Sequence, residues 1–431
     1  MNYEQLASLE PALAKFLEKI RHCFKRDNTF SYMQKYILGL MADLKRKSIE
    51  PIALACGVAV RTLQEFLSFL KWDHQLADKT LIRQVVERQH GKCSIGVADG
   101  SGHVKQGIHT PGVQRQWCGE TGKKDNCVVG CHLLYTDNDA KNPFNCVVAS
   151  DLYLPQSWDN DRQRCRDAGI PDEIIYRPRW KITIEQIERV MAEGLRFDYV
   201  TFDEEYGKVP EFIFELDRVG QKAIGEVPAN FRVWVTPPAY KSNRAEYSSH
   251  RVDDILRHSP VFYNQKWKKV KIKDTTRGLC VWSIKSEQVY LVKHIDDKPY
   301  CPVPSHRTYW LIVAKNTQTG EFKYFIGNAP VKEAIKRLLE VAFSRWHVEK
   351  WFERAKQECG FGAFEVRTYT SLMRHWLACR LAMYFLADQT NRLRGEKSAD
   401  NIRAGSRCCE YAGLEDLAEV SSFVETKGVC M

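Results

Sequence analysis

The sequence lacks several features that mark common protein classes. It has no run of about eighteen apolar residues, and its first five residues do not show the basic and then apolar layout of a secretory signal. We therefore expect a cytoplasmic protein. A phosphate-binding P-loop, a dinucleotide fingerprint and the Gly-x-Ser-x-Gly elbow of serine hydrolases are also absent, which argues against nucleotide-dependent and serine-nucleophile enzymes of those types.

Zinc-finger spacing is missing as well. The fifteen cysteines are an odd number scattered along the chain, as expected for buried thiols in a reducing compartment. Cys127, Cys131 and His132 come nearest to a metal cluster, but no second Cys or His pair follows at finger spacing. We expect no zinc site.

The composition is that of a folded globular protein. The chain has 431 residues, of which 44% are hydrophobic and 27% charged, so it predicts two to four structural units with a substantial core. A net charge of +10 makes a polyanion such as nucleic acid a candidate partner, although many enzymes are equally basic.

Residues 1–90 have apolar side chains at helical spacing. Within them, residues 52–67 have the rhythm of a helix-turn-helix, with Gly57 in the turn. Arg61, Thr62 and Gln64 open the second helix and are candidates for DNA contact. Plain helical packing explains the same pattern, and both interpretations stay open.

Short apolar runs follow after residue 90. Residues 94–98, 128–135, 146–150 and 198–202 predict four strands. Between the third and fourth lies a predicted helix, for which Thr183 is the expected cap and Gln186 occupies the capping-box position. This order of strands and helix predicts an α/β fold.

The second half begins with strands and ends with helices. Strands are predicted at 231–235, 279–284, 289–292 and 309–313, with a hairpin loop at 316–320. Helical patterns return at 331–358 and 372–391, and the tail after Arg394 has little pattern. The predicted units are 1–90 (helical), 91–211 (core, first part), 212–333 (β-rich insertion), 334–394 (core, second part) and 395–431 (tail).

Two aspartates lie where predicted strands end. Asp99 is followed by Gly100-Ser101-Gly102, which we interpret as a flexible turn that leaves the carboxylate exposed. Asp203 directly follows the strand at 198–202. Sites in open α/β sheets assemble at such strand ends, so the first and fourth strands should be neighbours.

A third acid, Glu349, lies on a predicted helix. At about 100° per residue, Arg345, Glu349 and Lys356 share one face, and the apolar Val348 and Phe352 near it predict that this face packs against the sheet. A structural ion pair is the plainer explanation of this stripe. Three convergent carboxylates, however, suit Mg²⁺-dependent phosphodiester cleavage, because hard Mg²⁺ prefers oxygen ligands.

These residues belong to a longer pattern that resembles the DDE transposases of bacterial insertion sequences, specifically the group around insertion sequence 701 and the related group with a Tyr-Arg-Glu-Lys signature. The matching motifs are Asp99-Gly100-Ser101-Gly102-His103-Val104-Lys105-Gln106-Gly107, Gln114-Arg115-Gln116-Trp117-Cys118-Gly119, Leu152-Tyr153-Leu154-Pro155, Asp203-Glu204-Glu205-Tyr206-Gly207, Val227-Pro228-Ala229-Asn230, and residues 345–356 with Glu365-Val366-Arg367. The resemblance covers about residues 20–390.

The resemblance implies a ribonuclease-H-like catalytic core in which Asp99, Asp203 and Glu349 bind metal. It also implies that Arg345 and Lys356 contact phosphates at the transposon end, and that the segment between Asp203 and Glu349 holds a β-rich insertion domain. Lys105, Arg115 and Arg367 lie in matching motifs and are further candidates for DNA contact. The signature's Tyr falls on Ala342, so its role is lost or supplied elsewhere.

Other DNA contacts are predicted from the insertion. Residues 266–273 read as a strand in which Lys269, Lys271 and Lys273 share one face, forming a basic ribbon; a solvated edge strand is the alternative. Related enzymes stack a flipped base on a Trp of the insertion. Trp267, Trp282 and Trp310 are candidates for this role, although sheet packing explains each of them more simply.

The sequence therefore predicts a DNA transposase that binds terminal inverted repeats of double-stranded DNA, cleaves with Mg²⁺ (or Mn²⁺) and joins the freed 3′-OH to target DNA. Two DNA ends suggest a homodimer, and the bacterial setting suggests association with the nucleoid. The alternatives are another ribonuclease-H-like nuclease and a non-catalytic DNA-binding regulator.

Overall fold

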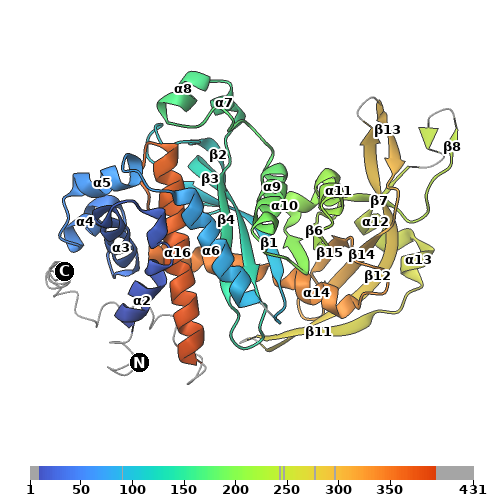
Figure 1. Cartoon of the computed structure of the whole chain (residues 1–431). Coiled ribbons are helices and arrows are strands. Elements are labelled where there is room, and N and C mark those ends of the chain that lie inside the picture. The colour runs from blue at the N-terminus through green and yellow to red at the C-terminus, as the bar shows by residue number, and fades with distance from the viewer. Residues whose placement is uncertain are drawn as a thin grey trace.

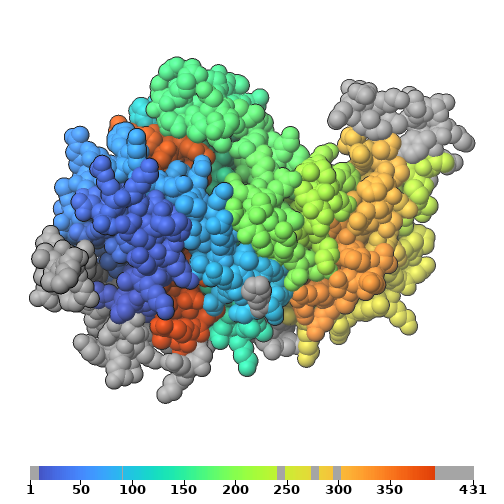
Figure 2. Space-filling model, viewed as in Figure 1, coloured from blue at the N-terminus to red at the C-terminus, as the bar shows by residue number. Residues whose placement is uncertain are grey.

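The computed structural model describes residues 9–89, 91–241, 244–245, 248–275, 278–295 and 298–394. Helices of the N-terminal region lie on one side, a mixed sheet with its helices lies in the centre, and a β-rich region lies on the other side (Figure 1). The space-filling view shows the same order of segments across the molecule (Figure 2). The predicted tail at 395–431 lies outside the described residues.

The N-terminal region is helical, as predicted. It contains α2 (Leu9–Glu18), a 3-10 helix (Arg21–Cys23), α3 (Asp27–Met41), α4 (Ile49–Ala55), α5 (Val60–Ser68) and α6 (His74–Gln89). Gly57 joins α4 to α5 with a φ of +62°, a conformation that glycine adopts at little cost. Leu63, Phe66 and Leu67 of α5 are buried, and the helices pack against the long C-terminal helix α16. The predicted helix-turn-helix pair is therefore present as a structural unit.

The central sheet contains β1 (Ile95–Val104), β2 (Gln114–Cys118), β3 (Lys123–Thr136), β4 (Asn145–Leu152) and β5 (Tyr199–Phe202). Its order is β2-β3-β1-β5, with β4 also paired to β3. Strand β1 is antiparallel to β3 and parallel to β5. The prediction that the first and fourth strands are neighbours is confirmed.

The predicted turn after Asp99 is wrong. Strand β1 continues through Gly100, Ser101 and Gly102 and stays paired with β3 as far as Val104. A Cβ atom on Gly102 would lie 2.9 Å from the Cys118 sulfur, so glycine here permits close packing rather than a turn. Asp99 consequently lies inside a strand and is mostly buried.

Helices α7 (Gln156–Asp159), α8 (Arg162–Asp167), α9 (Arg179–Ala192), α10 (Glu204–Gly207) and α11 (Pro210–Arg218) accompany this sheet. The predicted cap of α9 is wrong, because the helix begins four residues before Thr183. Thr183 and Gln186 lie fully buried inside it, and the Gln186 amide donates to the Cys131 carbonyl and to Asp151, both at 2.8 Å. Gln186 thus ties α9 to the sheet instead of closing a helix end.

The β-rich region consists of β6 (Ile224–Val227), β7 (Arg232–Trp234), β8 (Tyr240–Lys241), β9 (Arg244–Ala245), β10 (His250–Arg251), α12 (Val252–His258), α13 (Pro260–Tyr263), β11 (Lys268–Thr275), β12 (Gly278–Ile295), β13 (Lys298–Pro304), β14 (Tyr309–Asn316) and β15 (Phe322–Gly327). Its main sheet has the order β10-β7-β12-β14-β15-β6, with β11 and β13 paired to β12. The strands predicted at 279–284 and 289–292 form one strand, β12. The hairpin loop at 316–320 is confirmed.

Three helices complete the described chain: α14 (Ile335–Phe343), α15 (Trp346–Cys359) and α16 (Tyr369–Arg394). The helical pattern at 331–358 is thus divided near Ser344, and Arg345 directly precedes the second helix. One continuous hydrophobic cluster extends from α2 through both sheets to α16. Among the described helices, none has the length and apolar character needed to cross a membrane.

Candidate active site

The parallel pairing of β1 with β5 brings the two aspartates together. Ala98 is paired with Phe202; Asp99 is the next residue on β1, and Asp203 directly follows the end of β5. Asp203 caps helix α10, where its carboxylate accepts hydrogen bonds from the backbone N–H groups of Glu205 at 3.0 Å and Tyr206 at 3.3 Å. The Asp99 carboxylate accepts one from the Gly100 N–H at 2.7 Å. Both side chains are therefore held by the backbone around them.

Glu349 reaches these aspartates through Arg345. The Arg345 guanidinium lies 2.6 Å from Glu349 Oε1 and 3.7 Å from Asp99 Oδ2. Helix α15 packs against β1 and β4 through its buried Val348 and Phe352, as predicted, whereas the Glu349 side chain is 49% exposed. The alternative of a structural ion pair is also realised in part, because Arg345 and Glu349 form one.

The electrostatics of the site are those of crowded acids around one cation. Burial, and then the negative charge of Asp203, raise the pKa of Asp99 to about 7, while Arg345 opposes this rise. Burial also raises the pKa of Asp203. Since both carboxyl groups are destabilised in their charged form, added positive charge would stabilise the site.

This donor set fits a divalent metal in chemistry and in charge. It offers carboxylate oxygens, which hard divalent cations prefer, and the mutual repulsion of Asp99 and Asp203 is the kind that such a cation relieves. Within the described part of the chain, no three acidic, His or Cys side chains lie close enough together to share an ion as they stand. Arg345 instead supplies the positive charge, and Glu349 turns to it.

Lys356 lies two helical turns after Glu349 on the same side of α15, as predicted. Its ammonium group donates to the Gly102 carbonyl of β1 at 3.0 Å and to Glu120 at 2.9 Å. Glu120 was not among the sequence candidates. It follows the matched segment at 114–119, in the turn between β2 and β3, and nothing in its local pattern marks it.

Lys105 occupies a different position from the one expected of a DNA contact. Its ammonium group donates to the carbonyls of Gly362 at 2.8 Å and Phe364 at 2.7 Å, and it lies 3.6 Å from the centre of the Phe364 ring. Burial lowers the pKa of Lys105 to about 8. The side chain is turned inward and fastens β1 to the segment after α15, so its position favours a structural role.

The other predicted DNA contacts are dispersed over the surface. Arg61 and Gln64 are exposed on α5, where Arg61 pairs with Glu65 at 2.9 Å, and Thr62 is half-buried. Arg115 on β2 and Arg367 after α15 are exposed. None of these side chains joins the carboxylate site.

The basic ribbon is altered by the pairing of its strand. Lys269 and Lys271 are exposed on β11, but the register with β12 shifts between Lys271 and Lys273. This bulge interrupts the alternation that was expected to align the three lysines, and the Lys273 side chain lies outside the described residues. Nearby, Trp282 is buried against Phe343, whereas Trp267 is partly exposed.

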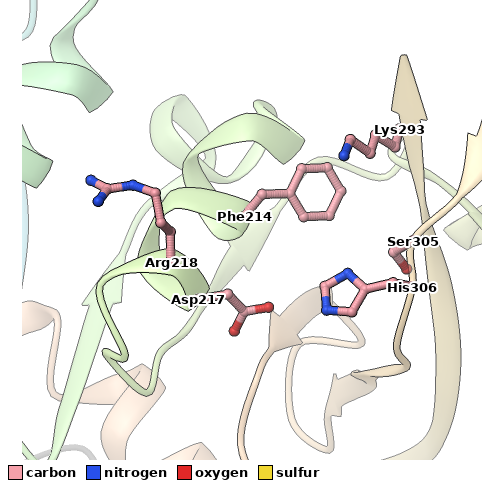
Figure 3. Close-up of a pocket in the computed structure, with 6 residues that line it drawn as sticks. All are labelled: Phe214, Asp217, Arg218, Lys293, Ser305 and His306. Atoms are coloured by element: carbon pink, nitrogen blue, oxygen red, sulfur yellow. The ribbon is translucent and has the colours of Figure 1, made fainter. Parts of the chain in front are cut away.

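A separate cavity of about 300 Å³ lies between α11 and the β-rich region (Figure 3). It is lined by Phe214, Asp217, Arg218, Lys293, Ser305 and His306. Its carboxylate is already engaged, because Asp217 accepts hydrogen bonds from Tyr309 and Asn328. Arg218 points away from the cavity toward Glu188 and Glu215. This cavity shares no residue with the carboxylate site.

Comparison with known proteins agrees with this geometry. A family model described as "DDE superfamily endonuclease" matches residues 19–279, which is more than half of the chain. The chain belongs to this DDE superfamily. A second model, described as "Transposase DDE domain", matches residues 177–386. The resemblance on which the predicted site rests is thereby confirmed at the level of the family.

A relative within this group is the probable transposase for insertion sequence element IS701 from Microchaete diplosiphon. It is 27% identical to this chain over 206 residues. The matched segment is 47% of this chain and spans only half the length of that relative.

Proposed function

We propose that this DDE-family protein is a DNA transposase that binds the terminal inverted repeats of its element, cleaves there and joins the freed 3′-OH to target DNA. The observation that carries the proposal is the pairing of Ala98 with Phe202, because it places Asp99 beside Asp203. Arg345 links Asp99 to Glu349 and so supports the inclusion of the third acid.

The catalytic core in this proposal is ribonuclease-H-like. A central β1 flanked by antiparallel β3 and parallel β5 supports that assignment, as does the helix α9 between β4 and β5. The proposed units remain 1–90, 91–211, 212–333, 334–394 and 395–431. The boundary at 211 falls within α11, and the boundary at 333 lies just before α14, which begins at Ile335.

Asp99, Asp203 and Glu349 would hold divalent Mg²⁺, with Mn²⁺ as a substitute. Bound there, the metal would polarise the scissile phosphate and activate the attacking oxygen. The role of Arg345 is to contribute fixed positive charge beside the acids and to receive a phosphate of the DNA end. Lys356, whose ammonium group lies against β1, would position a neighbouring phosphate.

Duplex DNA would be recognised away from these acids. The α4–α5 pair, with Arg61, Thr62 and Gln64, is the proposed reader of the terminal repeat. Arg115, Arg367 and the lysines of β11 are proposed to contact the backbone. Two ends of one element favour a homodimer on DNA, and this substrate would place the protein at the nucleoid.

The test is cleavage and joining of DNA that carries the gene's own flanking ends. Wild type is compared with Glu349→Gln, which keeps the shape of the side chain but removes its charge. We expect Mg²⁺-dependent joined products from wild type and none from the variant. Cutting without joining would favour another nuclease of this fold, and end binding without cutting in Mg²⁺ or Mn²⁺ would favour a non-catalytic regulator.

A further inference from the structure

A second cavity, of about 250 Å³, lies between the N-terminal helices and helix α15. One wall is the loop from Leu44 to Ser48, which connects α3 to α4. The opposite wall is the C-terminal end of α15 and the segment that follows it, represented by Lys356, Gly360 and Glu365. We call this cavity the basic groove, because Lys45, Arg46, Lys47 and Lys356 line it.

One of these cations holds the groove together. The Lys47 ammonium group donates to the carbonyls of Leu40 at 2.9 Å, Ala42 at 2.6 Å and Glu358 at 2.6 Å. These three bonds satisfy its donors, so Lys47 joins the loop to the end of α15 and has none to spare for a ligand.

The other three cations of the basic groove have fewer protein partners than Lys47. Within the part of the chain that the structure describes, exposed Lys45 has no hydrogen-bond or ion-pair partner. Arg46 pairs with Glu365 at 2.8 Å, and both side chains are more than 60% exposed. Lys356 pairs with the half-exposed Glu120. The Arg46–Glu365 pair is exposed and therefore weak, so the closely spaced phosphates of a polyanion can replace its carboxylate.

The basic groove lies between the predicted DNA-reading helices and the strand that carries Asp99. Its loop leads straight into α4, the first helix of the predicted DNA-reading pair. At the other wall, Lys356 touches the Gly102 carbonyl, three residues from Asp99 on the same strand. The basic groove therefore connects the proposed reading helices with the catalytic strand.

We propose that the basic groove binds backbone phosphates of the element-end DNA between the α4–α5 pair and the carboxylates, with Lys45 and Arg46 as contacts. In the absence of DNA, Glu365 forms an ion pair with Arg46 and Glu120 forms one with Lys356. This inference rests on the proposed function, because it takes the DNA end as the occupant.

The experiment measures binding of a fluorescent duplex carrying the gene's flanking end to the full-length protein, over a series of salt concentrations without divalent metal. The variants are the double change Lys45→Gln with Arg46→Gln, the single change Glu365→Gln, and Lys332→Gln as an exposed control outside the groove. Circular dichroism and thermal unfolding confirm that each variant is folded.

Loss of two phosphate contacts should weaken binding at least tenfold and make the slope of log affinity against log salt less negative by about 2. Glu365→Gln should tighten binding severalfold, because it frees Arg46 and removes a repelling charge. A structural role of the pair would not produce this opposite sign. Lys332→Gln should match wild type.

The inference is overturned if the double variant behaves like Lys332→Gln, or if wild type does not bind the duplex. Failure of the proposed function looks different. If wild type binds through the groove but neither cuts nor joins in Mg²⁺, the groove stands and the transposase does not. If it cuts and joins while the double variant binds normally, only the groove is refuted.

Discussion

Three lysines of this protein differ in what their ammonium groups contact. Lys47 and Lys105 donate only to backbone carbonyls in the described structure and are turned inward. Lys45 is exposed. The local sequence does not predict this difference, since Lys45 and Lys47 are two residues apart in one basic run.

Lys47→Met should therefore lower the stability of the fold. The change removes three hydrogen bonds from the buried Lys47 ammonium group to the carbonyls of Leu40, Ala42 and Glu358, and we expect a loss of about 2 to 4 kcal/mol. Lys45→Met is the matched control and should change stability by less than about 0.5 kcal/mol. Urea unfolding followed by circular dichroism measures both. Equal stability of the two variants would contradict the assignment.

Buried histidines should make the fold sensitive to acid. His132 and His375 are buried, and burial lowers their pKa values to about 3 and about 4, from an ordinary value near 6.5. The unfolded chain takes up protons first, so stability is complete above pH 6.5 and is lost as the pH falls toward 4. At pH 5 each histidine should remove about 2 kcal/mol relative to pH 7.5.

Urea unfolding at these two pH values measures the effect. His375→Gln should remove part of the pH dependence whatever it does to stability at pH 7.5, because the remaining change then comes from His132 and other groups. An unfolding free energy that is the same at pH 7.5 and pH 5 would refute this account.

At the scale of elements, the observed strands and helices agree with the prediction where the spacing of apolar residues within one segment determines the structure. The four core strands and the α4–α5 pair occur where the apolar pattern predicts them. The predictions were wrong where packing or pairing with another element determines the structure. Gly102 looks like a turn residue, yet β1 runs on through it because β3 pairs along its whole length. Thr183 looks like a cap, yet packing against the sheet extends α9 past it.

The end of helix α15 offers an element-scale prediction. Gly360 ends the helix with a φ of +60°, and a Cβ atom there would lie 2.5 Å from the Lys47 Cβ. Gly360→Ala should destabilise the protein by more than the roughly 1 kcal/mol that the backbone conformation alone costs. Gly57→Ala is the matched control, because Gly57 has a φ of +62° and open space around it. Thermal unfolding of both variants separates backbone strain from a steric clash with Lys47. Equal losses of stability in the two variants would exclude the clash.

On the scale of the whole molecule, the candidate site joins distant parts of the chain. Asp99 comes from β1, Asp203 from the end of β5 and Glu349 from α15, and the whole β-rich region lies between the second and third acids. Burial, and then the negative charge of Asp203, raise the pKa of Asp99, which is a cost to the fold that bound metal would offset.

Metal removal should therefore lower thermal stability. Saturating Mg²⁺ or Mn²⁺ should stabilise wild type over the same protein in EDTA, by about 2.7 kcal/mol when the ion is at a hundred times its dissociation constant. The gain should shrink in Glu349→Gln and vanish in the double variant Asp99→Asn with Asp203→Asn. Without metal, that double variant should be at least as stable as wild type. An equal gain in all three proteins would place the ion elsewhere.

The sequence by itself determined the order of the three acids, the family, and the helical spacing that sets Arg345 against Glu349, because a helix places residues four apart on one face whatever surrounds it. Only the tertiary structure decided that Asp99 is buried within a strand, that Lys105 is turned inward, and that a basic loop before α4 faces the end of α15. Those contacts join residues that lie from tens to hundreds of positions apart in the chain. They depend on how the sheets and helices pack, so the spacing of residues within one segment does not predict them.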